Sequence, residues 1–174
     1  MELKRHSSNV SRLAVIIGSE LDINNKELKQ LSISALYHDI GKTKISSKIL
    51  DKPGKLSNIE MDIMKYHPRF GAEIVKTKGL ELSIVEAILY HHENFDGSGY
   101  PKGIKGSEIP LYARIIAIAD AYDAMTNNRP YSLAKTHEQA IKEIKSCSGT
   151  QFDPQLVKVF EILSEEINSL GTVI

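Results

Sequence analysis

The sequence has little cysteine, no tryptophan and no excess charge of either sign. Cys147 is the one cysteine among 174 residues, which excludes an intramolecular disulfide and a cysteine-based metal site. Acidic and basic residues number 22 each, and without a basic excess a long DNA or RNA partner is not expected. No apolar run approaches the about 18 residues of a membrane span. We therefore expect a reducing, cytoplasmic setting and no membrane span in this chain.

Hydrophobic residues make up 41% of the chain, enough for one domain with a substantial core. They recur at three-to-four spacing, and no strand-like alternation competes with this pattern. We predict an all-α, single-domain bundle of about seven to eight helices. The predicted helices cover about residues 2–21, 25–39, 57–67, 69–76, 81–91, 110–126, 136–146 and 154–170. Residues 94–110 form one long irregular stretch, which is typical of a functional or disordered segment.

Local signals mark several helix ends. Ser57 and Glu60 fit a capping box at the start of one helix. Asp153 followed by Pro154 predicts the start of the last helix. His67 precedes Pro68, and because proline disfavours a helical preceding residue, we expect His67 to end a helix.

An adjacent His-Asp pair, His38 and Asp39, stands at the end of the second predicted helix, with Gly41 as a helix stop. The imidazole and the two carboxylate oxygens can bind metal, and one carboxylate can bridge two cations. Lys42 follows about one turn later, where it could contact a phosphate oxygen. A helix C-terminus that simply carries histidine and lysine would show the same residues, since both suit the helix dipole there.

Further nitrogen and oxygen donors recur along the chain, with no thiolate among them. They are Glu2, His6, His67, His91, His92 and Asp120. Glu2 and His6 lie four residues apart and share a helix face, as a solvated pair also would. Asp120 interrupts an apolar helical pattern, and a carboxylate there needs a metal, a cation or several donors.

For several residues close to these donors in the sequence, more than one role is compatible with the pattern. Glu93 directly follows the histidine pair and is expected to fix the histidine tautomers. Asp123, one turn after Asp120, fits either a support for the site or an exposed carboxylate. Asn9 is expected to be polar and exposed, and His67, taken alone, is most simply structural.

The donor set suits iron, manganese or other divalent first-row metals, and two or three ions would use it fully. Two close cations bind phosphodiester oxygens and lower the pKa of a bridging water, whose hydroxide attacks phosphorus in line. Lys42 and Arg129 would offset charge on the phosphate. Tyr100 and Phe95 could stack on a base.

The ordered motifs resemble those of an HD-GYP domain, a branch of the HD metal-dependent phosphohydrolases, over nearly the whole chain. They are His38-Asp39-Ile40-Gly41-Lys42, Lys52-Pro53-Gly54-Lys55-Leu56, His67-Pro68 with Gly71, His91-His92-Glu93, Asp96-Gly97-Ser98-Gly99-Tyr100-Pro101, Ile109-Pro110, Ala113-Arg114-Ile115, the run from Ala119 to Thr126, Arg129-Pro130-Tyr131 and the run from Gly149 to Pro154. The sequence departs from the family at Thr43 to Ser46, beside the site, and at Ser132, where a basic residue is frequent.

The resemblance implies a helical bundle with two or three iron or manganese ions. It also implies hydrolysis of cyclic di-GMP to the linear dinucleotide pGpG and, in some members, on to GMP. By position, the metal ligands would be Glu2, His6, His38, Asp39, His67, His91, His92 and Asp120. Asp39 would be the bridge and, with Lys42, catalytic; substrate contacts would come from Lys42, Arg129, Tyr100 and Arg114.

Family members usually carry sensory or receiver domains upstream, so residues 1–174 fit an output domain excised from a longer regulated protein. A diguanylate cyclase (GGDEF) domain protein and a second copy of the chain are further expected partners. Two alternatives stay open: a catalytically silent module that binds a cyclic dinucleotide or a protein, and an HD hydrolase of another nucleotide. Nothing in the physical chemistry of the residues selects guanine.

Overall fold

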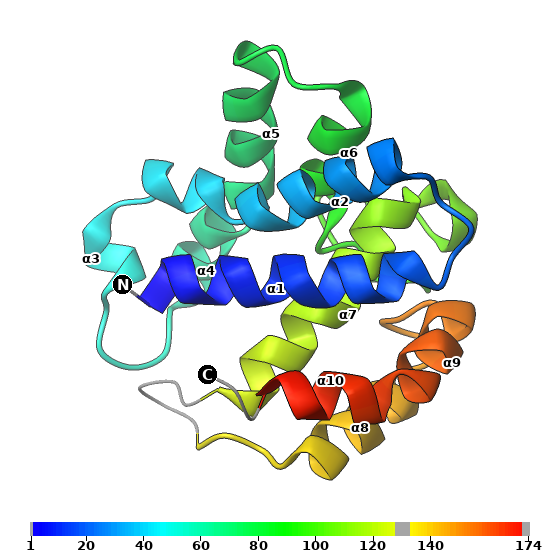
Figure 1. The fold of residues 1–174 in the computed structure, drawn as a ribbon. Helices are drawn as coiled ribbons and strands as arrows, with labels where there is room; N and C mark the ends of the chain where they lie inside the picture. The colour runs from blue at the N-terminus through cyan, green and yellow to red at the C-terminus, as the bar shows by residue number, and fades with distance from the viewer. Residues whose placement is uncertain (1, 128–132, 172–174) are drawn as a thin grey trace.

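The computed structural model describes residues 2–127 and 133–171, and helices are the regular secondary structure of these residues (Figure 1). The α-helices are α1 (Glu2–Ser19), α2 (Asn25–Tyr37), α3 (Ser47–Leu50), α4 (Asn58–Met64), α5 (His67–Thr77), α6 (Leu82–Tyr90), α7 (Leu111–Thr126), α8 (His137–Ser146), α9 (Pro154–Ile162) and α10 (Ser164–Gly171). Two 3₁₀ helices, η1 (Ile40–Lys44) and η2 (Gly106–Glu108), complete the set. Within these residues no strand is formed, so the all-α prediction is confirmed.

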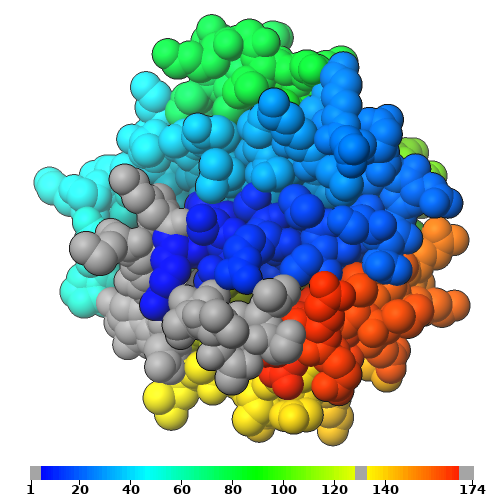
Figure 2. Space-filling model, in the orientation of Figure 1, coloured from blue at the N-terminus to red at the C-terminus, as the bar shows by residue number. Residues whose placement is uncertain are grey.

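The centre of the bundle is α1, which packs against α2 on one side and α7 on another (Figure 1). Their contact surfaces are apolar at helical spacing, with Val10, Ile17, Leu31 and Ile115 fully buried. In the space-filling view α1 lies between α2 and α10 on one face of the molecule (Figure 2). This arrangement places the start of α1 beside the middle and end of α7, which matters for the site.

A second, smaller core joins α5 to α6 through Ala72, Val75, Ile84 and Ile88. These two helices form a hairpin at the top of Figure 1, and the first turns of α5 pack against η1. The end of α2 therefore runs directly into the segment that contacts α5. None of the described helices is both long and apolar enough to cross a membrane.

The predicted helix ends agree with the structure except in three places. The capping box of Ser57 and Glu60 and the Asp153 cap are present. His67 does not end a helix but begins α5, because Pro68 sits in the first turn, where its missing N–H costs nothing. The expected loop 43–57 contains the single turn α3, and the expected last helix is divided into α9 and α10. These two differences raise the number of described α-helices from the expected eight to ten.

Candidate metal centre

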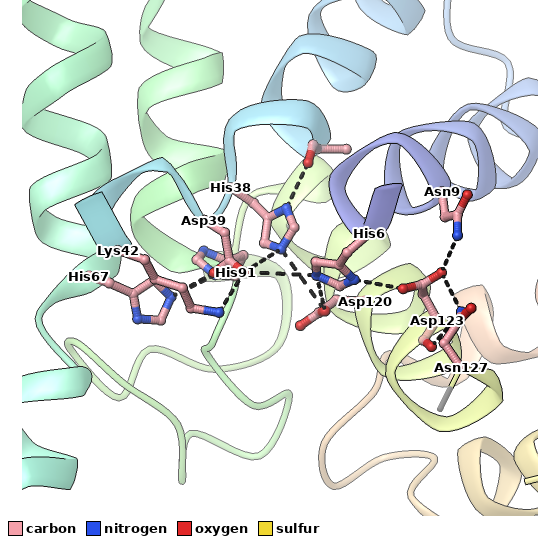
Figure 3. A network of polar contacts seen from close by, with 11 residues as sticks. His6, Asn9, His38, Asp39, Lys42, His67, His91, Asp120, Asp123 and Asn127 are labelled. Carbon is pink, nitrogen blue, oxygen red and sulfur yellow. Dashed lines mark hydrogen bonds and ion pairs between the residues drawn. The ribbon is translucent and has the colours of Figure 1, made fainter. Parts of the chain in front are cut away.

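Donor side chains from five parts of the bundle meet at one place (Figure 3). His38 caps the end of α2, Asp39 precedes η1, His67 begins α5 and His91 caps the end of α6. The remaining donors are His6 on α1, His92 directly after His91, and Asp120 on α7. Four of the donors, His38, Asp39, His67 and His91, are at most 3% exposed.

Gly41 allows η1 to lie directly on the first turns of α5. A methyl group at this position would overlap the carbonyl oxygen of His67 and would lie 2.5 Å from the backbone nitrogen of Gly71. The absence of a side chain therefore brings the two backbones together. As a result, Asp39 Oδ1 lies 3.3 Å from His67 Nε2.

The first set of donors, here called the three-histidine group, consists of His67, His91 and His92. The Nε2 atoms of His67 and His91 are 3.4 Å apart. Each of these two rings donates its Nδ1–H to the carbonyl oxygen three residues earlier, at 2.8 and 2.7 Å. A carbonyl can only accept, so this contact fixes the tautomer and leaves the Nε2 lone pair facing the group.

The second set, here called the mixed group, consists of His6, His38 and Asp120. His6 Nε2 lies 3.2 Å from Asp120 Oδ1, and His38 Nε2 lies 4.0 Å from the same oxygen. The Nδ1–H of His38 also donates to a backbone carbonyl, that of Ala35, at 2.7 Å. This ring therefore also presents Nε2 to the group.

Asp39 lies between the two groups and turns one oxygen toward each. Its Oδ1 faces His67, while its Oδ2 lies 3.5 Å from His38 Nε2 and 3.8 Å from His6 Nε2. This is the placement expected of a carboxylate that bridges two cations.

The donors fit divalent metal ions. His38 Nε2 is a buried nitrogen without a hydrogen-bond partner, and such an atom is costly unless something binds it. Nitrogen and oxygen atoms that share one ion at about 2.1 Å lie roughly 3.0–3.4 Å apart for coordination angles near 90–110°. The separations of 3.2–3.5 Å between these donor atoms lie close to that spacing. The chain can therefore hold divalent metal in these groups.

The charge states of His91, His92 and Asp39 also suit metal binding. Burial and the neighbouring histidines hold the pKa of His91 well below its usual value, and burial with the charge of His67 lowers the pKa of His92 to about 4. Burial acts against ionisation of Asp39, but the charges of His38 and Lys42 outweigh it and keep the carboxyl pKa well below its usual value. Neutral imidazole and ionised carboxylate are the forms that ligate metal.

Residues around the donors border the open side of the site. Lys42 Nζ lies 2.5 Å from Asp39 Oδ2, and 29% of its side chain is exposed. The ring of Tyr100 stacks on His92, with centroids 4.9 Å apart. Glu93 does not orient the histidines, contrary to our expectation. Its carboxylate accepts the backbone N–H groups of Lys102 and Gly103 and so anchors the irregular stretch that carries Tyr100.

Of three further predicted site residues, the structure describes the side chain of Arg114 alone. Arg129 lies outside the described residues. Glu2 belongs to α1, but its side chain lies outside the described part. Arg114 contacts Asp153 at 2.5 Å and the carbonyl of Ile109 at 2.9 Å. These contacts give Arg114 a structural role, and its contact with substrate stays a prediction.

Sequence reasoning left the role of Asp123 open and missed the polar network that this residue forms behind His6. Asp123 is buried and accepts the Nδ1–H of His6 at 2.6 Å. Asn9, expected to be exposed, is half-buried and donates to the same carboxylate, as does Asn127. One signal was available: Asp123 follows Asp120 by three residues and Asn127 follows Asp123 by four, which makes a polar stripe on an otherwise apolar helix.

Known proteins agree with this architecture. A family model described as "HD domain" matches residues 1–156. The chain is 40% identical over 173 residues to a cyclic di-GMP phosphodiesterase of Thermotoga maritima, covering 98% of this chain and 47% of that protein. It is 41% identical over 150 residues to the cyclic di-GMP phosphodiesterase response regulator RpfG of Xanthomonas campestris pv. campestris, covering 85% and 40%.

A solved structure from Vibrio cholerae, a cyclic GMP-AMP specific phosphodiesterase (V-cGAP3), superposes with a TM-score of 0.69 at 25% identity, covering 92% of this chain and 44% of that one. The chain spans less than half the length of each of these three proteins. The family model nevertheless covers residues 1–156 of the 174. The chain therefore belongs to the HD domain family, in its HD-GYP branch.

Proposed function

We propose that this domain is a metal-dependent phosphodiesterase that hydrolyses cyclic di-GMP to linear pGpG and then to GMP. The observation that carries the proposal is the position of Asp39, with one oxygen toward each donor group, beside the unpartnered Nε2 of His38. Support for the substrate comes from the relatives named cyclic di-GMP phosphodiesterases.

When bound, two divalent cations would polarise the phosphodiester and lower the pKa of a shared water. Asp39, held between the groups, would fix the spacing of the two ligand sets. Lys42 borders both the cluster and solvent, so its ammonium group can place a positive charge beside a phosphate oxygen. Tyr100 packs over His92 and offers a ring at the edge of the site on which a base could stack. Arg129 is the further proposed phosphate contact.

The ions proposed are iron or manganese, the metals that the family resemblance implies, and the imidazole and carboxylate donors are compatible with them as with other divalent first-row metals. Two ions follow from the two donor groups. A third would need Glu2, which is placed at the start of α1, one turn from His6.

The test is product analysis by chromatography. Protein purified without oxygen and loaded with iron or manganese is incubated with cyclic di-GMP, with and without a chelator. We expect pGpG, followed by GMP, and neither product with the chelator. Absence of product despite bound metal would refute the proposal and favour a silent binding module.

A second substrate has specific support, since the solved structure from V. cholerae is named for cyclic GMP-AMP. The same assay with 3′3′-cyclic GMP-AMP measures the preference directly. We propose cyclic di-GMP as the better substrate, and a higher kcat/KM for cyclic GMP-AMP would reverse the assignment.

Control of the activity is proposed to come from elsewhere in a longer protein. One relative is named a response regulator, and this chain covers 40% of it, which leaves room for a receiver or sensory domain. A cytoplasmic location, a GGDEF-domain partner and a homodimer stay predictions from the family resemblance.

A further inference from the structure

Asp123 is a buried carboxylate whose two oxygens have separate tasks (Figure 3). Its Oδ2 accepts the Nδ1–H of His6 at 2.6 Å. Its Oδ1 accepts one amide N–H from Asn9 and one from Asn127, each at 2.9 Å. The two amides hold the carboxylate from the side away from the donor groups, so Oδ2 has a fixed position against His6.

This support differs from that of the neighbouring histidines. His38, His67 and His91 each give Nδ1–H to a neutral backbone carbonyl. His6 gives its Nδ1–H to a charged carboxylate, in a contact shorter than any of those three. A carboxylate on the far nitrogen fixes the ring orientation, as a carbonyl does, and in addition raises the electron density at Nε2.

Among the described residues, only the mixed group contains a histidine that Asp123 supports. His6 Nε2 points into the mixed group, 3.2 Å from Asp120 Oδ1. The carboxylates of Asp120 and Asp123 lie on either side of the His6 ring, Asp120 at Nε2 and Asp123 at Nδ1. No contact of Asp123 reaches the three-histidine group within the part of the chain that the structure describes.

We propose that Asp123 is a positioning residue that holds His6 through Nδ1 and strengthens Nε2 as a ligand, so that the two ion positions on either side of Asp39 differ in affinity. The negative charge of Asp123 selectively strengthens the position formed by the mixed group. This inference rests on the metal-binding part of the proposed function and is independent of which nucleotide is hydrolysed.

The test compares the wild type with Asp123→Asn. Asparagine keeps the shape and can still accept the His6 N–H, but it removes the charge. Metal-free protein is titrated with Mn²⁺ while electron paramagnetic resonance measures the free ion, which gives the number and affinity of the sites. We expect Asp123→Asn to weaken one class of site by about 10–100-fold and to leave the other class unchanged.

A matched control and a second variant separate this role from a general loss of stability. Asp153 is equally buried and accepts hydrogen bonds from Arg114 and Gln155, yet it contacts no donor histidine. Asp153→Asn should leave both affinities unchanged. Asn9→Ala removes one of the two amides that hold Asp123, so it should weaken the same class of site by a few-fold, even if Asp123→Asn does not fold.

A spectroscopic readout identifies the ion affected. In protein loaded with ⁵⁷Fe, Mössbauer spectra should show one iron signal displaced in Asp123→Asn and the other unchanged. Equal weakening of both classes, or wild-type affinity at both, would overturn the inference while leaving the proposed function standing. A wild type that binds no divalent ion would overturn both.

Discussion

Metal loading should stabilise the fold, and Asp39→Ala should abolish that effect. Asp39 is the one residue of the described cluster that places an oxygen beside each donor group, at 3.3 Å from His67 and 3.5 Å from His38. In the proposed site its removal would take a ligand from both ions at once. His92→Ala, by contrast, would remove a ligand from the three-histidine group alone.

The size of the effect follows from linkage between binding and folding. An ion present at 100 times its Kd adds about 2.7 kcal/mol to the free energy of unfolding, so two such ions add about 5 kcal/mol. For a domain of this length each kcal/mol raises Tm by about 2–4 °C, which gives a rise of about 10–20 °C on loading. His92→Ala should keep about half of this rise, and Asp39→Ala almost none.

The assay is a thermal melt of each variant with Mn²⁺ and with a chelator, and the quantity compared is the difference between the two Tm values. This difference removes any effect of the substitution on the metal-free protein. Asp62→Ala is the matched control, since Asp62 is an exposed carboxylate whose partner is Lys65 at 3.9 Å. It should keep the full rise. A rise in Asp39→Ala as large as that in His92→Ala would refute the bridging role.

Three further substitutions test the parts around the ions. Lys42→Ala should keep the metal-dependent rise in Tm but lower kcat about 10²-fold, and unchanged kinetics would remove Lys42 from the mechanism. Gly41→Ala should lower the free energy of unfolding in urea by about 1–3 kcal/mol, because the added methyl meets the backbone of α5. Gly106→Ala is the control, because a methyl group there would contact no other atom of the described residues and the only cost is the positive φ. It should lower the free energy of unfolding by less than Gly41→Ala does, and a larger loss for Gly106→Ala would contradict the packing argument. Glu93→Ala should speed hydrogen exchange in residues 94–110 and spare the helices; exchange like that of the wild type would show that the carboxylate does not anchor this stretch.

Much of the fold was accessible from the sequence because its signals are local. The capping box of Ser57 and Glu60 lies within one helical turn, and the apolar spacing of α1 and α7 repeats within each helix. Such patterns depend on the backbone period alone. The boundary at His67 was assigned to the wrong helix because a proline is compatible with both the end of one helix and the start of the next.

The site was accessible only in part, since its contacts join residues far apart in the chain. His6 and Asp123 are 117 positions apart, and only the packing of α1 against α7 brings them together. Adjacency misled the interpretation of Glu93, which follows His92 but turns to the N–H groups of a later loop. The motif around Arg114 indicated a contact with substrate but gave no sign of its contact with Asp153, which lies 39 residues away.

The central claim is that Asp39 lies between two cations. Anomalous diffraction from crystals loaded with Mn²⁺ tests it most directly. The account predicts two peaks, one beside Asp39 Oδ1 and the three-histidine group, the other beside Asp39 Oδ2 and the mixed group. A single ion, or ions that do not contact Asp39, would contradict it.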